Sequence, residues 1–267
     1  MGDSFSEGSS NELPVHSVYV SGFYMGRTEV TYSQWQEVYN WAVANGYTDL
    51  PAGSGKGANH PVHTVSWYDV VKWCNAASER AGLSAVYRHS DGSIYRTGEI
   101  TPVIEYGHNG YRLPTEAEWE KAARGGLSGK RFPWGNTISH ANANYRADGD
   151  RYPYDVSPFT DLRLHPDYDD GGYPYTSPVG SFAANGYGLY DMAGNLWEWC
   201  GDWYGSYPSG SVSNPTGPSS GSIRVFRGGN CYYYAFYCRV SNRSYDLPFS
   251  RGGSNFIPIG FRLARSQ

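Results

Sequence analysis

The sequence predicts an α+β fold with a small antiparallel sheet, about three helices and much irregular structure. Its 267 residues include 34 Gly and 16 Pro, and 16% of them are aromatic. Glycine and proline favour turns, whereas large rings can fill a core between irregular segments. No long Ser/Pro linker or charge block divides the chain, so we expect a single domain over residues 1–267.

Three segments carry the signals of a helix start. In each, a Ser or Thr is followed three residues later by a side chain that can bond back to the backbone, at Thr31 to Gln34, Ser66 to Asp69 and Thr115 to Glu118. Apolar residues then recur at spacings of three and four, which is typical of one buried helical face. We expect a helix of about ten to fourteen residues after each start.

The remaining chain is predicted to contain short strands and a long loop. Alternating residues at 16–20 and 223–227 indicate strands with one solvent-facing side. Residues 127–185, called the middle segment below, lack sustained periodicity and are rich in Gly, Pro, Tyr and Asp. We expect the middle segment to be an ordered loop held by aromatic packing.

Composition also limits the classes of function. A net charge of -4 argues against a nucleic-acid-binding surface, which depends on clustered Lys and Arg. No run approaches the roughly 20 apolar residues that cross a bilayer, and the first residues lack the apolar core of a signal peptide. If the natural protein is exported, we expect its signal to have been removed.

The four cysteines do not form a recognisable scaffold. Cys74, Cys200, Cys231 and Cys238 are few and widely spaced, and they lack the paired C-x-x-C spacing of a zinc site. The sequence leaves open whether Cys74 and Cys200 pair.

Seven blocks stand in the order typical of formylglycine-generating-enzyme-like domains, also called sulfatase-modifying factor domains. Examples are YRLPTEAEWEKAARGG at 111–126 and GLYDMAGNLWEW at 188–199, and the others lie at 23–31, 60–67, 132–135, 227–229 and 260–262. The resemblance implies a C-type-lectin-like fold of the formylglycine-generating-enzyme type. In that family a Met-Gly pair usually follows an apolar strand, so Met1-Gly2 is expected to mark a trimmed N-terminus.

An oxidase of this family binds copper through two cysteines that follow a Gly-Gly-Ser block. Here Gly228-Gly229-Asn230 is followed by Cys231 and Cys238, which are seven residues apart rather than the family's five. Counting from Gly228 places a tyrosine at the first cysteine position, and counting back from Cys238 assigns that residue to a structural position. Because Cu(I) needs both sulfurs within bonding reach, we expect no catalytic residues.

Residues 227–266, called the C-terminal segment below, have an unusual composition. They contain the run CYYYAFYC at 231–238 and no Lys, Glu, Gln, Met or Trp. Codons randomised at their first two positions, with a pyrimidine in the third, cannot encode those five types. One interpretation of the run is a buried core strand. However, alternate side chains of a strand point to opposite faces, so five rings around Ala235 cannot all be buried, and tyrosine is favoured in binding loops.

The C-terminal segment interleaves framework residues with residues that share no chemistry. This is similar to the variable region of retroelement-diversified variable proteins, including the treponemal type. The resemblance implies a non-catalytic, hypervariable ligand-binding protein with massive sequence variation. The ligand-contacting residues it predicts are Cys231, Tyr232, Tyr233, Tyr234, Phe236, Tyr237, Tyr245, Asp246, Phe249, Asn255, Phe256 and Ile257. The framework arginines are expected to be buried or half-buried against carboxylates or carbonyls; they are Arg239, Arg243, Arg251 and Arg262.

We expect the partner to be a protein or glycan on another cell and the protein to be displayed at a cell surface, lipid-anchored or exported. No cofactor is expected. One alternative is a copper-dependent oxidase acting on a cysteine substrate, and another is a carbohydrate-binding lectin-like module that uses aromatic stacking and calcium.

Two acidic features are candidates for structural calcium. Asn195 and Glu198 match positions where the family can bind this ion, although Glu198 is equally suited to a core ion pair with an arginine. Asp167, Asp169 and Asp170 could offer calcium oxygens, but an isolated acidic loop is more often solvated. His60 and His63 are expected to pack or hydrogen-bond.

Overall fold

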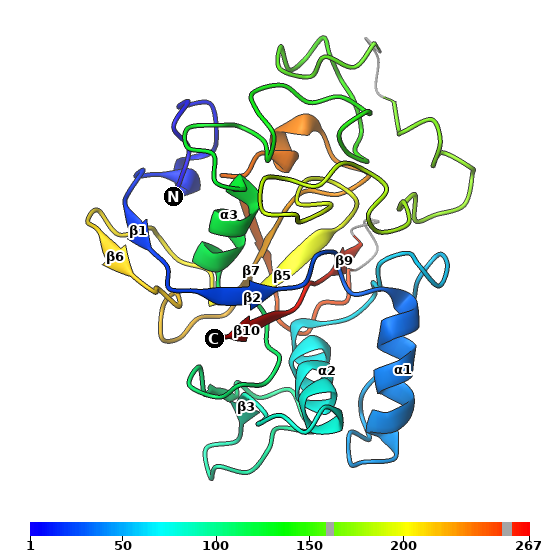
Figure 1. Cartoon of the computed structure of the whole chain (residues 1–267), viewed down its shortest axis with the longest axis vertical. Helices are drawn as coiled ribbons and strands as arrows, with labels where there is room; N and C mark the ends of the chain where they lie inside the picture. Colours follow the sequence, from blue (N-terminus) through cyan, green and yellow to red (C-terminus); the bar gives the residue numbers. More distant parts are fainter. Residues whose placement is uncertain (159–162, 253–257) are drawn as a thin grey trace.

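The computed structural model describes residues 1–158, 163–252 and 258–267 (Figure 1). The predicted contacts Asn255, Phe256 and Ile257 lie outside the described residues. The three long helices are α1 (Tyr32–Val43), α2 (Trp67–Arg80) and α3 (Glu116–Arg124), and two short 3-10 helices are η1 (Ser10–Glu12) and η2 (Ala235–Cys238).

All three long helices begin where the sequence predicts. Thr31, Ser66 and Thr115 each accept a hydrogen bond from the backbone N–H three residues later. The side chains of Gln34, Asp69 and Glu118 bond back to the N-cap backbone, which completes a capping box at each start. The predicted helix starts are therefore confirmed.

The central sheet has the strand order β8-β7-β5-β9, in which β5 (Trp197–Trp203) and β7 (Arg224–Arg227) form the middle. β8 (Arg243–Asp246) and β7 are antiparallel, as are β7 and β5, whereas β9 (Ile259–Gly260) runs parallel to β5. The small sheet is thus mixed, not purely antiparallel as the sequence predicts. The difference arises because the chain after β8 crosses to the opposite edge before it forms β9.

Three strand pairs lie outside the central sheet. β1 (Val18–Tyr19) is parallel to β6 (Val212–Ser213), and β2 (Phe23–Met25) is antiparallel to β10 (Ala264–Ser266). β3 (Tyr87–Arg88) is antiparallel to β4 (Val103–Ile104). The last residues of the chain therefore pair with some of the first.

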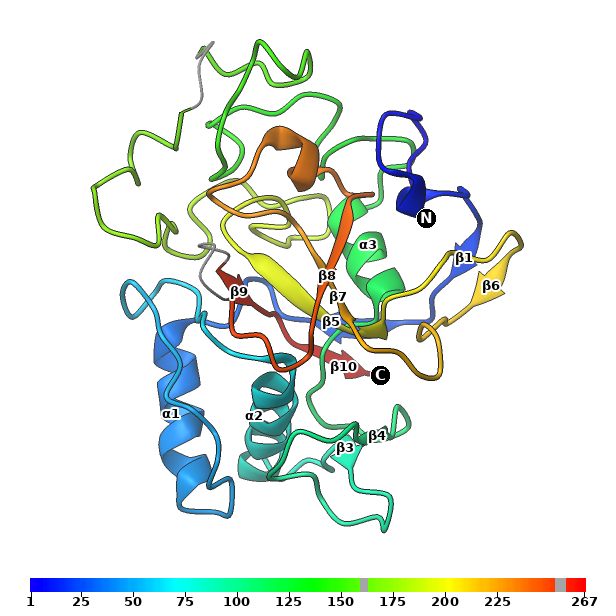
Figure 2. The same ribbon diagram turned by 180° about the vertical axis from the view of Figure 1, so that it is seen from behind.

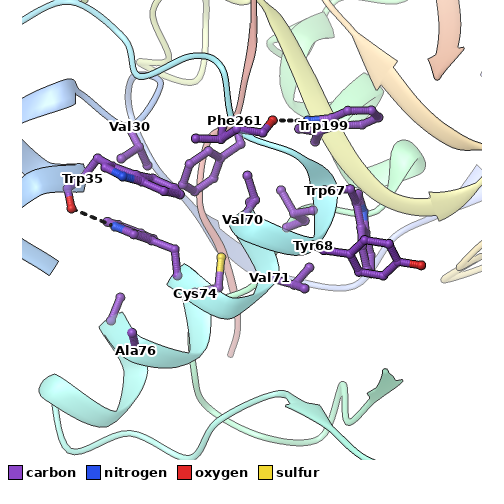
Figure 3. Packing of buried hydrophobic residues seen from close by; sticks show 14 of the residues in the cluster. Val30, Trp35, Trp67, Tyr68, Val70, Val71, Cys74, Ala76, Trp199 and Phe261 are labelled. Carbon is purple, nitrogen blue, oxygen red and sulfur yellow. Dashed lines mark hydrogen bonds between the residues drawn. The ribbon is translucent and has the colours of Figure 1, made fainter. Parts of the chain in front are cut away.

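The largest core cluster lies between α1, α2 and the central sheet. Figure 3 shows Trp35, Val70 and Phe261 converging from three separate parts of the chain. The ring of Phe261 meets the rings of Trp35 and Trp73 edge-on, at centroid distances of 6.0 and 5.4 Å. Residues just after the C-terminal strand β9 thus complete the core begun by the first two helices.

The middle segment is an ordered loop, as predicted. In its described residues the backbone forms turns and isolated bridges but no longer strand or helix. Aromatic packing holds it: the rings of Phe132 and Trp134 stack at 6.0 Å, and those of Tyr152 and Tyr154 at 5.6 Å. Figures 1 and 2 show this segment, in green, around the orange η2. The middle segment therefore borders the run of rings at 231–238.

Candidate ligand-binding surface

The aromatic run forms a turn followed by η2 and is not a strand. A 3-10 helix has about three residues per turn, so residues three apart share one side. Ala235 and Cys238 accordingly face the core and are fully buried. The rings that flank them are half-buried and together form what we call the aromatic surface: Tyr232, Tyr233, Tyr234, Phe236 and Tyr237.

Residues of the middle segment pack against the aromatic surface. The ring of Tyr175 stacks on Tyr232 at 5.9 Å, and that of Tyr152 stacks on Phe236 at 6.1 Å. The backbone N–H of Arg146 donates to the carbonyl of Tyr233 at 3.0 Å. The surface is therefore built from two distant parts of the sequence.

Tyr233 and Tyr237 connect the aromatic surface to the central sheet. Their rings meet at 4.9 Å, and each lies 6.1 Å from the ring of Trp197 on β5. Gly229 lets the backbone before the run lie close to the side chain of Cys238. Its φ is 77°, and an added Cβ would lie 2.8 Å from Cys238 Sγ, so a larger residue does not fit here.

A second group of predicted contacts lies on and after β8. Tyr245 and Phe249 are 48% and 55% exposed, and Asp246 is half-buried. Leu247 is 41% exposed between them and was not predicted. The sequence signal that could have identified Leu247 is its spacing, two residues from each of the predicted contacts Tyr245 and Phe249. This group offers apolar surface to solvent, whereas the rings of the aromatic surface are only partly accessible.

Cys231 is the predicted contact that does not fit a surface role. Its side chain is fully buried, and its backbone N–H donates to the carbonyl of Asn195 at 3.0 Å. The residue therefore belongs to the core beneath the aromatic surface.

The four framework arginines bind carboxylates, as predicted. Each pairs with an acidic residue outside the C-terminal segment: Arg239 with Glu12 at 2.8 Å, Arg243 with Glu116 at 2.6 Å, Arg251 with Asp69 at 2.7 Å and Arg262 with Glu198 at 2.7 Å. Three of the four guanidinium groups are buried, as predicted, whereas Arg251 is 44% exposed, so the predicted burial is wrong for this residue. The segment is thus fastened to the rest of the domain by ion pairs that do not involve its aromatic rings.

The cysteines do not present a ready copper site. Cys231 and Cys238 are free and fully buried. Burial raises the pKa of both thiols, that of Cys231 to about 12, which disfavours the thiolate form that binds metal. Cys74 and Cys200 are also free, which answers the question that the sequence left open.

Glu198 is the core carboxylate that the sequence allowed as an alternative to a calcium ligand. Its two oxygens accept from Arg262 at 2.7 Å, and one also accepts from Trp119 Nε1 at 2.8 Å. Asn195 Oδ1 accepts from Ser177, and its Nδ2 donates to Glu29. Glu198 therefore serves as a core carboxylate paired with an arginine, and Asn195 as a hydrogen-bonding residue beside it.

The other candidate ligands are also engaged or dispersed. Asp170 pairs with Lys56 at 2.7 Å. His60 and His63 bond through Nδ1 to the hydroxyls of Thr176 and Thr64, as expected for hydrogen-bonding residues. Within the described residues no three His, Cys, Asp or Glu side chains form a metal-binding group.

Two arginines of the middle segment border the aromatic surface, and the sequence did not point to them. The guanidinium carbon of Arg146 lies 5.8 Å from the ring centre of Tyr232 and 5.9 Å from that of Tyr234. That of Arg151 lies 5.0 Å from Tyr234 and 5.5 Å from Tyr152. Only the folded chain brings these arginines to residues that lie more than eighty positions later.

Across the described part of the chain, no helix has the length and apolar character needed to span a bilayer.

Comparison with known proteins places this architecture in a family. At the level of structure, Treponema denticola variable protein 1 matches with a TM-score of 0.71 and 29% identity over 94% of this chain and 87% of that one. A formylglycine-generating enzyme of Streptomyces coelicolor is 34% identical over 99% of this chain and 85% of its own length. That of Thermomonospora curvata is 35% identical over 84% of this chain and 62% of its own length.

The family model of the sulfatase-modifying factor enzyme 1-like domain matches residues 1–267. The fold, the seven sequence blocks and these relatives agree. The chain belongs to the sulfatase-modifying factor enzyme 1-like family.

Proposed function

We propose that this chain is a non-catalytic ligand-binding protein whose C-terminal segment forms the contact surface and is diversified by a retroelement. One observation carries the proposal: within this segment, the framework arginines form ion pairs with residues outside the segment, whereas the rings form no part of those ion pairs. The arginines reach inward to carboxylates, while the rings remain partly accessible. Such a division lets ring positions change without loss of the ion pairs.

Similarity to a variable protein supports the proposal. Treponema denticola variable protein 1 shares the fold at 29% identity over nearly the whole chain. The tyrosines of the aromatic surface and of β8 supply rings with polar tips, which give large contact area at small conformational cost. Binding energy would come from two or three such rings seated in a partner's pockets.

The proposal places the protein at a cell surface, lipid-anchored or exported, with a protein or glycan of another cell as its partner. It requires no cofactor. The net charge of -4 is consistent with a partner other than nucleic acid.

The test of diversification is made on the gene. Its 3′ end and the downstream region are sequenced to search for a near copy of the codons for residues 227–266 that differs only where the copy carries adenine. We expect such a copy, with adenines at the codons of the ring residues and not at those of Arg239, Arg243 or Arg262. A gene with no such copy would refute diversification.

A second candidate is a formylglycine-generating oxidase, which is favoured by the enzymes of that name at 34% and 35% identity. Its test is copper-dependent oxygen uptake with a cysteine-containing peptide, measured for the natural chain and for Cys238→Ser. Uptake that requires copper and is lost in the variant would establish the oxidase and end the non-catalytic proposal.

A further inference from the structure

We infer that Arg146 and Arg151 give the aromatic surface a built-in preference for acidic protein segments. This inference rests on the proposed function and names the chemistry of its partner. Both arginines lie outside the C-terminal segment, so their charge, unlike their stacking on Tyr232 and Tyr234, would persist while the rings change.

The two guanidinium groups are held against the surface by rings. Arg146 lies within 6 Å of both Tyr232 and Tyr234, and Arg151 lies 5.0 Å from Tyr234. A guanidinium is planar and stacks on aromatic faces, which orders it before a partner arrives. Less conformational entropy is then lost when its N–H groups bond to a ligand.

Neither guanidinium group is bonded to a partner among the described residues of the chain. Among the described residues, Arg146 and Arg151 form no ion pair and no side-chain hydrogen bond, in contrast to the arginines that fasten the C-terminal segment. Each carries five N–H donors and no acceptor. A partner that covers them must supply acceptors, and carboxylates bind this group through two parallel bonds.

Among the described acidic residues nearby, none forms an ion pair with Arg146 or Arg151. Asp148 Oδ1 accepts from the backbone N–H of Arg151, and Asp170 is paired with Lys56. Asp150 is exposed on the same turn without an ion pair to a described lysine or arginine. Two guanidinium groups without ion pairs thus face a partner beside two carboxylates, those of Asp148 and Asp150, that form no ion pair with a described lysine or arginine.

The packing of the rings argues against a sugar as the main ligand. Sugars bind aromatic residues by lying on open ring faces, but here Tyr232 is stacked by Tyr175, and Phe236 by Tyr152. Arg239 also lies over Phe236, at 4.3 Å. The two guanidinium groups beside these rings match the carboxylates and carbonyls of a peptide.

A displayed library of random twelve-residue peptides provides the test. It is panned against the full chain, against Arg146→Gln/Arg151→Gln, and against the control Arg27→Gln/Arg80→Gln. The control also removes two exposed arginines, one of which lies 5.3 Å from the ring centre of Tyr190. We expect Asp and Glu to be enriched about twofold or more for the natural chain and the control, and not for the first variant. The best acidic peptide should bind that variant about tenfold more weakly, which corresponds to about 1.4 kcal/mol.

Three results would overturn the inference. Selected peptides could lack acidic enrichment, or acidic peptides could bind the Gln variant as tightly as the natural chain. A defined heparin hexasaccharide could also bind the natural chain more tightly than any peptide, in which case the partner is an anionic glycan. Thermal unfolding of each variant confirms that it is folded.

A further variant separates this inference from the proposed function. If binding is unchanged in Arg146→Gln/Arg151→Gln but lost in Tyr232→Ala/Tyr234→Ala, the aromatic surface binds ligand and only the acidic preference is wrong. If no selected peptide depends on either pair, both proposals fail.

Discussion

Arg239 and Glu12 form a buried ion pair beneath η2. The guanidinium donates to both carboxylate oxygens, at 2.9 and 2.8 Å, and both side chains are almost fully buried. An arginine cannot lose its charge by deprotonation, so it requires this partner in the core. The pair ties the C-terminal segment to the first residues of the chain.

Replacing Arg239 by Met should lower the free energy of unfolding by about 3–5 kcal/mol, because Glu12 would be left buried without its partner. Urea unfolding at neutral pH measures the change. The exposed pair of Arg80 and Glu37 is the matched control, and Arg80→Met should cost about 0–1 kcal/mol. Equal costs for the two variants would show that the buried pair does not anchor the segment.

Asp202 is a buried carboxyl group whose pKa is raised by its surroundings. Its Oδ2 accepts from the backbone N–H of Glu116 at 2.8 Å. Burial, and next the charge of Glu116, raise the pKa of Asp202 to about 8. Because this folded pKa lies above the ordinary value of 3.8, the folded state binds more protons between these values, and stability falls as pH rises through that window.

Asp202→Asn should remove that pH dependence. The amide mimics the protonated acid and can accept the same hydrogen bond. Relative to the natural chain, the variant should gain stability between pH 5 and pH 8, by up to about 4 kcal/mol at about 1.4 kcal/mol per pH unit. Urea unfolding at both pH values tests this. A stability difference that stays constant over the range would mean that Asp202 is ionised in the folded protein.

At the scale of the element, η2 separates core from surface by its period of three. Ala235 and Cys238 are fully buried, whereas Phe236 and Tyr237 between them are half-buried. In a strand, successive side chains would point to opposite faces, so every second ring would be buried. The short helix therefore presents neighbouring rings together, which no strand of this sequence could do.

The variant Tyr232→Asn/Tyr234→Asn/Phe236→Asn should remain folded with a cooperative transition. Each ring makes partial contacts, so we expect a cost of about 1 kcal/mol per position. Cys238→Asn, a single change on the buried side of η2, should cost about 3 kcal/mol, because an amide would be buried without partners. Circular dichroism during thermal and urea unfolding compares them. Loss of the cooperative transition in the triple variant would place the rings in the core.

At the scale of the whole molecule, the last nine residues close the fold. Ile259 pairs with Trp197, Phe261 packs between the first two helices, and Arg262 neutralises Glu198. β10 then pairs with β2 near the start of the chain. The C-terminal segment therefore begins at the end of β7 and contains β8, β9 and β10. Its predicted contacts that the structure describes lie in the turn and η2 after β7, and on and after β8.

A chain ending at Pro258 should fail to fold. Loss of the Phe261 ring from the core lowers the free energy of unfolding by about 3–5 kcal/mol. Loss of Arg262 leaves Glu198 buried without its partner and lowers it by a similar amount. Together these losses approach the total stability of a typical domain, about 5–15 kcal/mol. We expect no near-ultraviolet circular dichroism and no cooperative unfolding. Removal of the exposed Gln267 alone should leave both unchanged, and a folded 1–258 chain would contradict this account.

Features encoded within a few neighbouring residues were predictable from the sequence. The three capping boxes span four residues each, and the helices begin at them. The aromatic run, its framework arginines and the family blocks could also be read directly. These features depend on local hydrogen bonding and on residue order, which a linear sequence displays.

Contacts between distant residues needed the folded chain. Glu12 and Arg239 are 227 positions apart, and many acidic residues could have been the partner. Three other features depend in the same way on the path of the chain in the folded state. They are the approach of Arg146 and Arg151 to the rings, the parallel pairing of β9, and the burial of Cys231. Carboxylates, rings and arginines recur throughout this chain. Residue type therefore indicates what kind of partner each side chain can bind, but not which one. Which ones meet is selected by the packing of the complete core, where every buried charge must find its partner at the same time.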